Sequence, residues 1–282
     1  MSGLSRARKP VIVEEIRRTK LTELLLEGRR LDSRGLTDYR PIKIEVGPIE
    51  RANGSALTQI GNTQVIVGVK AGLGAPFPDR PGEGVLMVNA EVLPLASPYT
   101  EPGPPDENSI ELARVVDRGI RESGMVDLGK LCIIPGRQVY TLYVDVNVLN
   151  VDGNLFDASS YAAVVAIATA NLPTYRVAGD GRVEATGETM PVPITNIPVS
   201  VTMARIGDAI IADPSAEEEA VMDARLTLVV DGAGRLCAGQ KGHGGYWTPE
   251  QIMEAARLAM RKAEENRRIL AEAVGRVREV PR

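Results

Sequence analysis

The 282-residue sequence predicts a mixed α/β fold of the α+β kind, with two related β-rich halves, a buried central helix and a long C-terminal helix. Residues 140–148 alternate between apolar and polar side chains, as a strand with one buried face does. Residues 161–170 are apolar on almost every side, which is typical of a helix surrounded by protein. Strand patterns lie on both sides of this pair, and their order differs from the regular alternation of a doubly wound nucleotide-binding fold.

Strand patterns dominate the first half and are framed by two helices. Residues 11–27 place apolar side chains at helical spacing, and Gly28 ends this helix. A second helix starts at Asn108 or Ser109 and runs to about Glu122. Strands are predicted at residues 42–46, 55–60, 63–70, 85–93, 131–134 and 140–148.

Two irregular connections separate these elements. Residues 72–84 are rich in glycine and proline and predict a long exposed loop, with Asp79 and Arg80 at its tip. Residues 97–108 form the second connection, which leads into the helix that follows.

A short turn, Asp152-Gly153-Asn154, joins the strand at 140–148 to the central helix. Asp157 or Ser159 can cap this helix, which runs to about Asn171 and is stopped by Pro173. Because a strand and a buried helix hold the turn on both sides, its groups are fixed in space. We therefore expect any chemical site of the first half at this turn.

The second half follows a stretch rich in glycine and proline and ends in a long helix. Thr248-Pro249-Glu250-Gln251 is a strong helix start, with a threonine cap, proline at the first helical position and glutamine three residues after the cap. Strands are predicted at about 198–205, 208–212, 226–230 and 235–240. The predicted units are an N-terminal helical extension at 1–28, a first subdomain at 29–175, a linker at 176–196 and a second subdomain at 197–282.

Composition indicates an ordinary folded protein in a reducing, cytoplasmic setting. The chain is 44% hydrophobic and 25% charged, and no apolar run approaches the roughly 20 residues of a membrane-spanning helix. Cys132 and Cys237 match no metal-binding or redox spacing. The net charge of −4 argues against a surface that is basic throughout but permits a local basic groove. No nucleotide-binding glycine motif occurs, so no cofactor is expected.

Few side chains suggest catalysis by themselves. His243 is the only histidine, which excludes a multi-histidine metal site, and a loop position without catalytic role is the favoured interpretation. Glu217 and Asp223 can flank a divalent metal or serve as acid and base, but an acidic surface turn is the simpler interpretation. We therefore predict no metal site.

Three arginines, Arg114, Arg118 and Arg121, share one face of the helix that begins near residue 108. Guanidinium groups on one stripe suit phosphate oxygens, because each can donate two charge-assisted hydrogen bonds. A solvated face with local Glu111–Arg114 and Asp117–Arg121 ion pairs explains the same spacing. On these residues alone the ion-pair interpretation is somewhat favoured.

Several motifs together resemble the RNase PH family over residues 28–270. N-G-S-A followed by G-N-T-x-V-I is distinctive, as is the D-G turn before an alanine-rich helix. Within the family, the leading helix and the run DPSAEEEAVMDARLT resemble the non-catalytic RNase PH-like subunit of the archaeal exosome. The matching segments are GRRLDSRGLTDYRP, ERANGSALTQIGNTQVIVGV, ELARVVDRGIRE and NVLNVDGNLFDASSYAA.

The resemblance implies a fold used for phosphorolytic 3′→5′ RNA degradation, in which phosphate is held by a turn of the form D-G-G-[ST]-R. Here Asn154, Leu155 and Phe156 follow the matching Asp-Gly, so the hydroxyl and the guanidinium are replaced by apolar side chains. Removing one such donor typically slows a reaction by ~10²–10³-fold. The expectation is a catalytically silent chain, in which Glu217 and Asp223 are a residual acidic pair.

The resemblance also reverses the interpretation of the arginines. Arg114 and Arg118 match positions that lie near the RNA 3′ end in catalytic relatives, and Arg121 lies one turn further, so all three become candidates for RNA binding. The implied partners are a catalytic RNase PH-like subunit, paired in three heterodimers that form a hexameric ring, RNA and RNA-binding cap subunits. Two alternatives stay open: an active homo-oligomeric nuclease with another phosphate ligand such as Arg137, and an RNA-binding scaffold without a nuclease partner.

Overall fold

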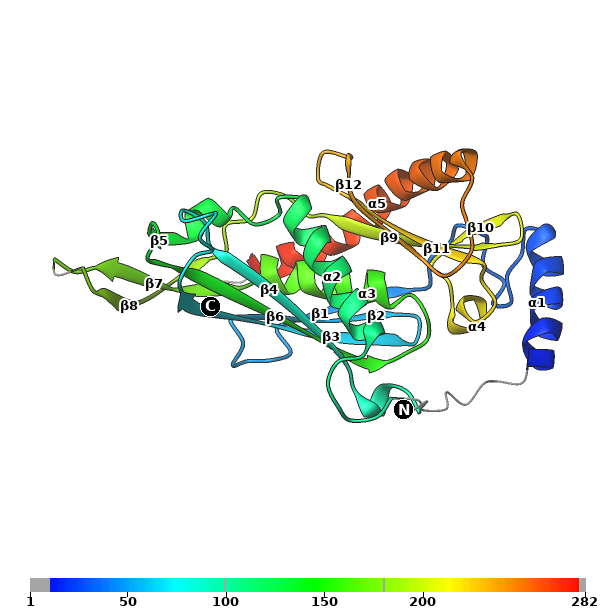
Figure 1. The fold of residues 1–282 in the computed structure, drawn as a ribbon, viewed down its shortest axis with the longest axis horizontal. Helices are drawn as coiled ribbons and strands as arrows, with labels where there is room; N and C mark the ends of the chain where they lie inside the picture. The colour runs from blue at the N-terminus through cyan, green and yellow to red at the C-terminus, as the bar shows by residue number, and fades with distance from the viewer. Residues whose placement is uncertain (1–10, 99, 180, 279–282) are drawn as a thin grey trace.

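The computed structural model describes residues 11–98, 100–179 and 181–278 and contains two large β-sheets, a two-stranded ribbon, and helices that pack between and across the large sheets (Figure 1). The first sheet has six strands in the order β1-β2-β3-β6-β4, with β5 paired to β6. Neighbouring strands are antiparallel except β4 and β6, which run parallel. The strands are β1 (Ile42–Val46), β2 (Gly54–Ile60), β3 (Thr63–Gly74), β4 (Val85–Val92), β5 (Cys132–Ile134) and β6 (Gln138–Asn150).

The predicted alternation in β6 is confirmed, and β2 and β3 form a hairpin that turns at Gly61-Asn62. Valines of β3 stand opposite valines of β6, for example Val67 opposite Val146, so both strands bury the same face. The buried β6 side chains are Tyr140, Leu142, Val144, Val146 and Val148.

The central helix α3 (Leu155–Ala168) packs between the first sheet and β9 and is buried on nearly all sides, as its composition predicts. Small side chains permit close approach: a Cβ at Gly54 would lie 2.3 Å from the carbonyl oxygen of Ala166. The helix begins earlier than the sequence indicates. Asn154, in left-handed conformation, caps it by accepting from the N–H of Asp157, so the predicted caps at Asp157 and Ser159 are wrong.

The second sheet is antiparallel, in the order β10-β9-β11-β12. Helix α5 (Pro249–Arg278) crosses it, and the reciprocal Thr248–Gln251 cap predicted for this helix is present. Helix α1 (Val11–Leu26) packs on the outer side through Leu21 and Leu25. The remaining elements here are β9 (Val199–Ile206), β10 (Ala209–Ala212), α4 (Ala216–Glu219), β11 (Ala224–Val230) and β12 (Leu236–Gly242).

Two segments complete the chain. The predicted linker at 176–196 carries the end of β7 (Asn171–Val177) and all of β8 (Val183–Pro191), which form a ribbon that projects from the body (Figure 1). The first ten residues of the predicted N-terminal extension lie outside the described residues. Short 3₁₀ helices occur at Pro94–Ala96 and Leu128–Leu131.

Helix α2 (Glu107–Glu122) lies against β4 and α3 and reaches β12 of the second sheet. Asp106 caps it by accepting from the N–H of Ser109, so the helix starts one residue before the predicted Asn108. Its position between the two sheets places the arginine face beside both halves of the molecule. In the described part of the chain, no helix is both long and apolar enough to cross a membrane.

Candidate functional site

The turn between β6 and α3 is closed by the loop that precedes α4. Gly153 has a φ of +81°, and a Cβ there would lie 2.5 Å from the carbonyl oxygen of Pro214, so only glycine fits. Asn154 follows with a φ of 50° and is 0% exposed. The two halves of the chain therefore meet directly at the turn, and Gly153 and Asn154 are buried between them.

The nitrogen atoms of Asn154 donate to carboxylates. Its side-chain amide donates to Asp157 Oδ2 at 2.9 Å and to Asp213 Oδ1 at 2.7 Å. Its backbone N–H donates to Oε1 of Glu219 at 2.8 Å. A free N–H at the start of a helix is the kind of group that binds an anion such as phosphate. Here the carboxylate of Glu219 holds that place.

Two arginines neutralise Asp213 behind the turn. Arg40 Nη2 lies 2.7 Å from Asp213 Oδ1, and Arg34 Nη1 lies 2.9 Å from Oδ2. Burial by itself raises the pKa of Asp213, but the hydrogen bonds and charge of Arg40 outweigh it and lower the pKa below its usual value. Arg40 also donates to the carbonyl oxygen of Asp152. The cations nearest the turn are thus bound within the protein.

Asp157 is buried, and no arginine or lysine of the described residues binds its carboxylate. Burial raises the pKa of Asp157 to about 6, although hydrogen bonds from Asn154, Thr202 and Tyr39 oppose the rise. The Tyr39 hydroxyl donates at 2.8 Å, and the backbone N–H and hydroxyl of Thr202 donate at 3.0 and 2.9 Å. Burial likewise raises the pKa of Glu219. The turn is therefore rich in buried carboxyl groups, which repel a further anion.

The two apolar replacements in the turn pack inward. Leu155 packs against the main hydrophobic core, and Phe156 is 6% exposed. The guanidinium carbon of Arg225, on β11, lies 4.1 Å from the centroid of the Phe156 ring. Arg225 Nη2 also donates to Glu111 Oε1 at 3.0 Å. The guanidinium of Arg225 thus lies over Phe156, but it donates to the carboxylate of Glu111.

The predicted acidic pair occupies two different environments. Glu217 is exposed on α4 and has no hydrogen bond or ion pair within the described residues. Asp223 is mostly buried and pairs with Arg18 of α1 at 2.5 Å and with Arg205 at 3.4 Å. It also accepts from the N–H of Gly207. Asp223 therefore helps to attach the N-terminal helix.

The three arginines of α2 differ in how they are bound. Arg114 is exposed, and its side chain has no hydrogen bond or ion pair among the residues described. Arg118 Nη2 donates to Gln240 Oε1 at 2.6 Å. Arg121 forms the predicted pair with Asp117, at 2.7 and 3.1 Å, and this hydrogen bonding raises its pKa.

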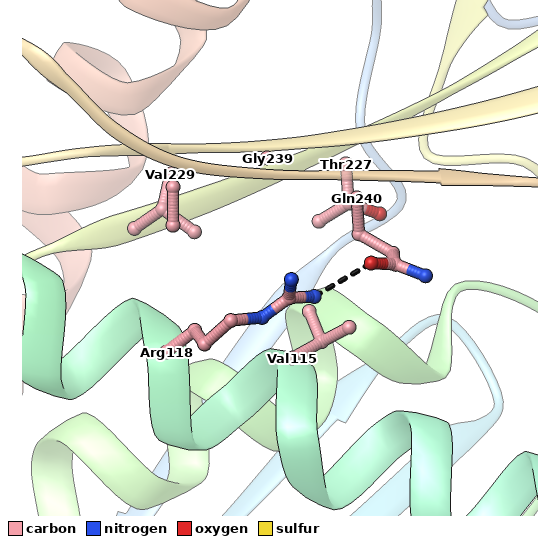
Figure 2. Close-up of a pocket in the computed structure, with 7 residues that line it drawn as sticks. Val115, Arg118, Thr227, Val229, Gly239 and Gln240 are labelled. Carbon is pink, nitrogen blue, oxygen red and sulfur yellow. Dashed lines mark hydrogen bonds between the residues drawn. The ribbon is translucent and has the colours of Figure 1, made fainter.

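Arg114 and Arg118 border a surface hollow of about 240 Å³ on the β4 side of α2. A smaller hollow lies between α2 and β12, and Figure 2 shows the Arg118 side chain running along it toward Gln240. The predicted Glu111–Arg114 ion pair does not form, because Glu111 instead binds Gln240 and Arg225. One arginine thus stays free of the local pairing that the spacing permitted.

The other candidates lie apart from both features. His243 sits in an exposed loop after β12, and burial together with the charges of Arg225 and Lys241 lowers its pKa. Arg137 precedes β6 whereas the turn follows it, a separation of roughly 40 Å at ~3.3 Å per strand residue. Arg137 therefore lies at the opposite end of β6 from the turn, and its role as another phosphate ligand stays a prediction.

The glycine- and proline-rich loop and the two cysteines form no organised site among the described residues. Arg80 pairs with Glu83 in the exposed loop, beside Asp79. Cys132 and Cys237 are free and half-buried. No group of three potential metal-ligating side chains from His, Cys, Asp and Glu occurs in the part of the chain that the structure describes.

Sequence reasoning missed Glu219, Asp213, Gln240 and Arg225. Asp213 and Glu219 lie within the run DPSAEEEAVMDARLT, but only the fold brings them to the turn. Gln240 and Arg225 belong to ordinary strand patterns, and nothing in their spacing marks them.

Comparison with known proteins places the chain among RNA-degrading enzymes and their relatives. Residues 38–173 match domain 1 of the 3′ exoribonuclease family, RNase PH, and residues 196–262 match its domain 2. The exosome complex component Rrp42 of Pyrococcus abyssi is 51% identical over 269 residues, which cover 95% of this chain and 98% of that protein.

Solved structures agree with the sequence relatives. A chain of the Archaeoglobus fulgidus exosome with RNA bound to the active site has a TM-score of 0.84 and 44% identity, covering 91% of this chain and 98% of that one. A chain of an archaeal exosome core has a TM-score of 0.81 and 40% identity, covering 92% and 98%. The chain belongs to the 3′ exoribonuclease family, with both RNase PH domains in one polypeptide.

Proposed function

We propose that this chain is a catalytically silent subunit of an exosome, a complex that degrades RNA from the 3′ end with phosphate as the attacking group. Its tasks are to complete the active-site cleft of a catalytic RNase PH-like partner and to bind RNA through Arg114 and Arg118. Support comes from relatives named as Rrp42 components, at about half identity over nearly the whole chain. The expected ring of three heterodimers, its cap subunits and its cytoplasmic location belong to the same proposal.

The observation that carries catalytic silence is the engagement of the Asn154 backbone N–H by the Glu219 carboxylate, at 2.8 Å. Phosphate carries at least one negative charge at neutral pH and needs donors that are not already bound. At this turn the Asn154 N–H is bound, and the side chains of Leu155 and Phe156 supply no donor. Phosphate would also have to displace a buried carboxylate and enter among other carboxyl groups.

The observation that favours RNA binding is the unpaired cation of Arg114 beside Arg118. Both border the same surface hollow, and neither binds a carboxylate among the residues that the structure describes. Backbone phosphates of RNA are the matching ligand, and such contacts give affinity with little sequence preference.

Purified chain alone, incubated with single-stranded RNA and inorganic phosphate, tests catalytic silence. We expect no nucleoside diphosphate release alone and robust release after addition of a catalytic RNase PH-like subunit. A complex of the same chain with a partner whose acidic active-site residues are replaced is the matched control. Phosphate-dependent release by the chain alone would overturn the proposal. Failure to form a complex of defined stoichiometry would contradict the partner role.

A further inference from the structure

We infer that Gln240 is a positioning residue for RNA binding, which holds the guanidinium of Arg118 ready for a phosphate without neutralising it. The inference rests on the proposed RNA role of Arg118. Arg118 leaves α2 and runs toward β12, where its Nη2 donates to the amide oxygen of Gln240 at 2.6 Å (Figure 2). Its Nε donates at 3.4 Å to the carbonyl oxygen of Arg114 one turn earlier. The side chain is therefore fixed at two points.

Gln240 is itself held from its other end. Its amide nitrogen donates to Glu111 Oε1 at 2.8 Å, and the same oxygen accepts from Arg225 Nη2 at 3.0 Å. Arg225 in turn stacks on Phe156 at the start of α3. The two partners fix which end of the amide is oxygen, because a guanidinium only donates and a carboxylate only accepts. The Gln240 amide thus presents its oxygen to Arg118.

A neutral acceptor is what distinguishes Arg118 from its neighbour on the same helix. Arg121 is bound by both oxygens of Asp117, which compensates its charge locally. Arg118 has an amide as its partner, so its positive charge is not compensated there. Five N–H donors belong to a guanidinium, and those bound to Nη1 have no partner within the described residues. They remain for a phosphate oxygen.

Holding the side chain in place favours binding for an entropic reason. An arginine loses rotamer freedom when a ligand immobilises it, and a side chain ordered beforehand loses less. Removing the hold is expected to weaken RNA affinity by about two- to tenfold, the range for immobilising one flexible side chain.

Gln240→Met and Gln240→Glu in the assembled complex test the inference. Affinity for single-stranded RNA is measured by fluorescence anisotropy without phosphate, over a range of salt concentrations, beside Arg118→Ala. Gln240→Met keeps the length of the side chain and every charge, so we expect weaker binding with an unchanged salt dependence. Gln240→Glu pairs with Arg118, so we expect weaker binding and a salt slope reduced by about 0.7, as for one lost phosphate contact to a single strand.

The double variant Arg118→Ala/Gln240→Met separates positioning from a general structural role. We expect it to bind RNA as Arg118→Ala does, because Gln240 acts only through Arg118. Gln64→Met, at a half-buried position of β3 away from α2, is the matched control and should leave RNA affinity unchanged. Two results would overturn the role of Gln240 but leave the RNA role of Arg118 intact. One is additive losses of affinity in the double variant, and the other is full affinity in Gln240→Met when Arg118→Ala binds RNA more weakly. Full affinity in Arg118→Ala would overturn the proposed RNA role as well.

Discussion

The turn before α3 and the arginine face of α2 lie in the same half of the fold, but they differ in how far the protein satisfies their polar groups. At the turn, the N–H of Asn154 donates to Glu219, its amide to Asp157 and Asp213, and Asp213 binds two arginines. On α2, the side chain of Arg114 has no partner within the described residues, and Arg118 has a neutral one.

This difference separates a structural polar cluster from a binding surface. Buried groups that satisfy one another stabilise a packed junction and leave nothing for a ligand. An exposed cation without a counter-ion contributes little to stability and keeps its capacity for an external anion. Changes at the turn should therefore alter stability, and changes on α2 should alter RNA affinity.

The largest effect is expected from Asp213→Asn. The substitution removes the buried carboxylate that Arg34 and Arg40 share, and breaking a buried ion pair typically costs ~3–5 kcal/mol. Arg34 keeps Asp32 at 2.6 Å and Arg40 keeps Asp152 at 3.6 Å, so we expect a loss near the lower end of that range. Chemical denaturation of the purified chain measures the free energy of unfolding. Arg114→Ala is the control and should change it by less than about 0.5 kcal/mol. Equal losses in the two variants would remove the contrast between the regions.

Next in size is the pH dependence that Asp157 gives to the turn. Its folded pKa of about 6 lies above its usual value of 3.8, so the folded state binds this proton more tightly than the unfolded chain does. This contribution to stability is complete below pH ~4 and is lost as the pH rises to ~6. The loss is roughly 3 kcal/mol at most, because each unit of difference between the folded and unfolded pKa corresponds to ~1.4 kcal/mol.

Asp157→Asn removes that titration. The stability of this variant relative to the unchanged chain should therefore improve between pH 4 and 6 and level off above it, as measured by urea denaturation at each pH. Asp213 acts in the opposite direction. Because the fold lowers the pKa of Asp213, its contribution to stability is present at pH values above its usual pKa and is lost as the pH falls. Using the difference between the two chains cancels that contribution. A difference that stays constant with pH would show that Asp157 is not a buried titrating group.

RNA binding by the assembled complex should respond to Arg114→Glu/Arg118→Glu. We expect about a tenfold loss of affinity for each arginine, since a hydrogen bond to a charged group contributes at least ~1.5 kcal/mol. The salt slope should fall by about 1.4, which is ~0.7 for each lost contact with a single strand. Lys43→Glu/Lys70→Glu, on strands of the first sheet, makes the same change in charge elsewhere. Unchanged affinity in the α2 variant, or an equal loss in the control, would place the RNA surface outside α2.

Sequence patterns predicted the fold more completely than the site, for a physical reason. The alternation in β6 and the apolar side chains on all sides of α3 are local consequences of burial, so the sequence of each strand or helix predicts that element by itself. The replacement of a hydroxyl and a guanidinium by Leu155 and Phe156 is also visible in the sequence. Glu219 reaches Asn154 across 65 residues, and Gln240 reaches Arg118 across 122, so these contacts exist only after both sheets have packed.

The helix caps show the same limit on a smaller scale. Asp157 has a favourable capping side chain, but in the fold it accepts hydrogen bonds from Tyr39 and Thr202. Asn154 adopts the left-handed conformation and caps the helix instead. Propensity thus identified that a helix starts here, and tertiary contacts decided at which residue.

The smallest effect is expected from Arg121→Ala, and it makes the contrast finer because Arg121 lies on the same helix face as Arg114. Its guanidinium donates twice to Asp117 and once to the carbonyl oxygen of Leu86, so an RNA phosphate would have to compete with a carboxylate already in place. We expect RNA affinity to change by less than about twofold, since a paired surface cation contributes ~0–1 kcal/mol. Asp117→Asn should instead strengthen RNA binding, by releasing the same charge. A loss in Arg121→Ala as large as that in Arg114→Ala would mean that helical position, and not the absence of an internal carboxylate, decides which arginines bind RNA.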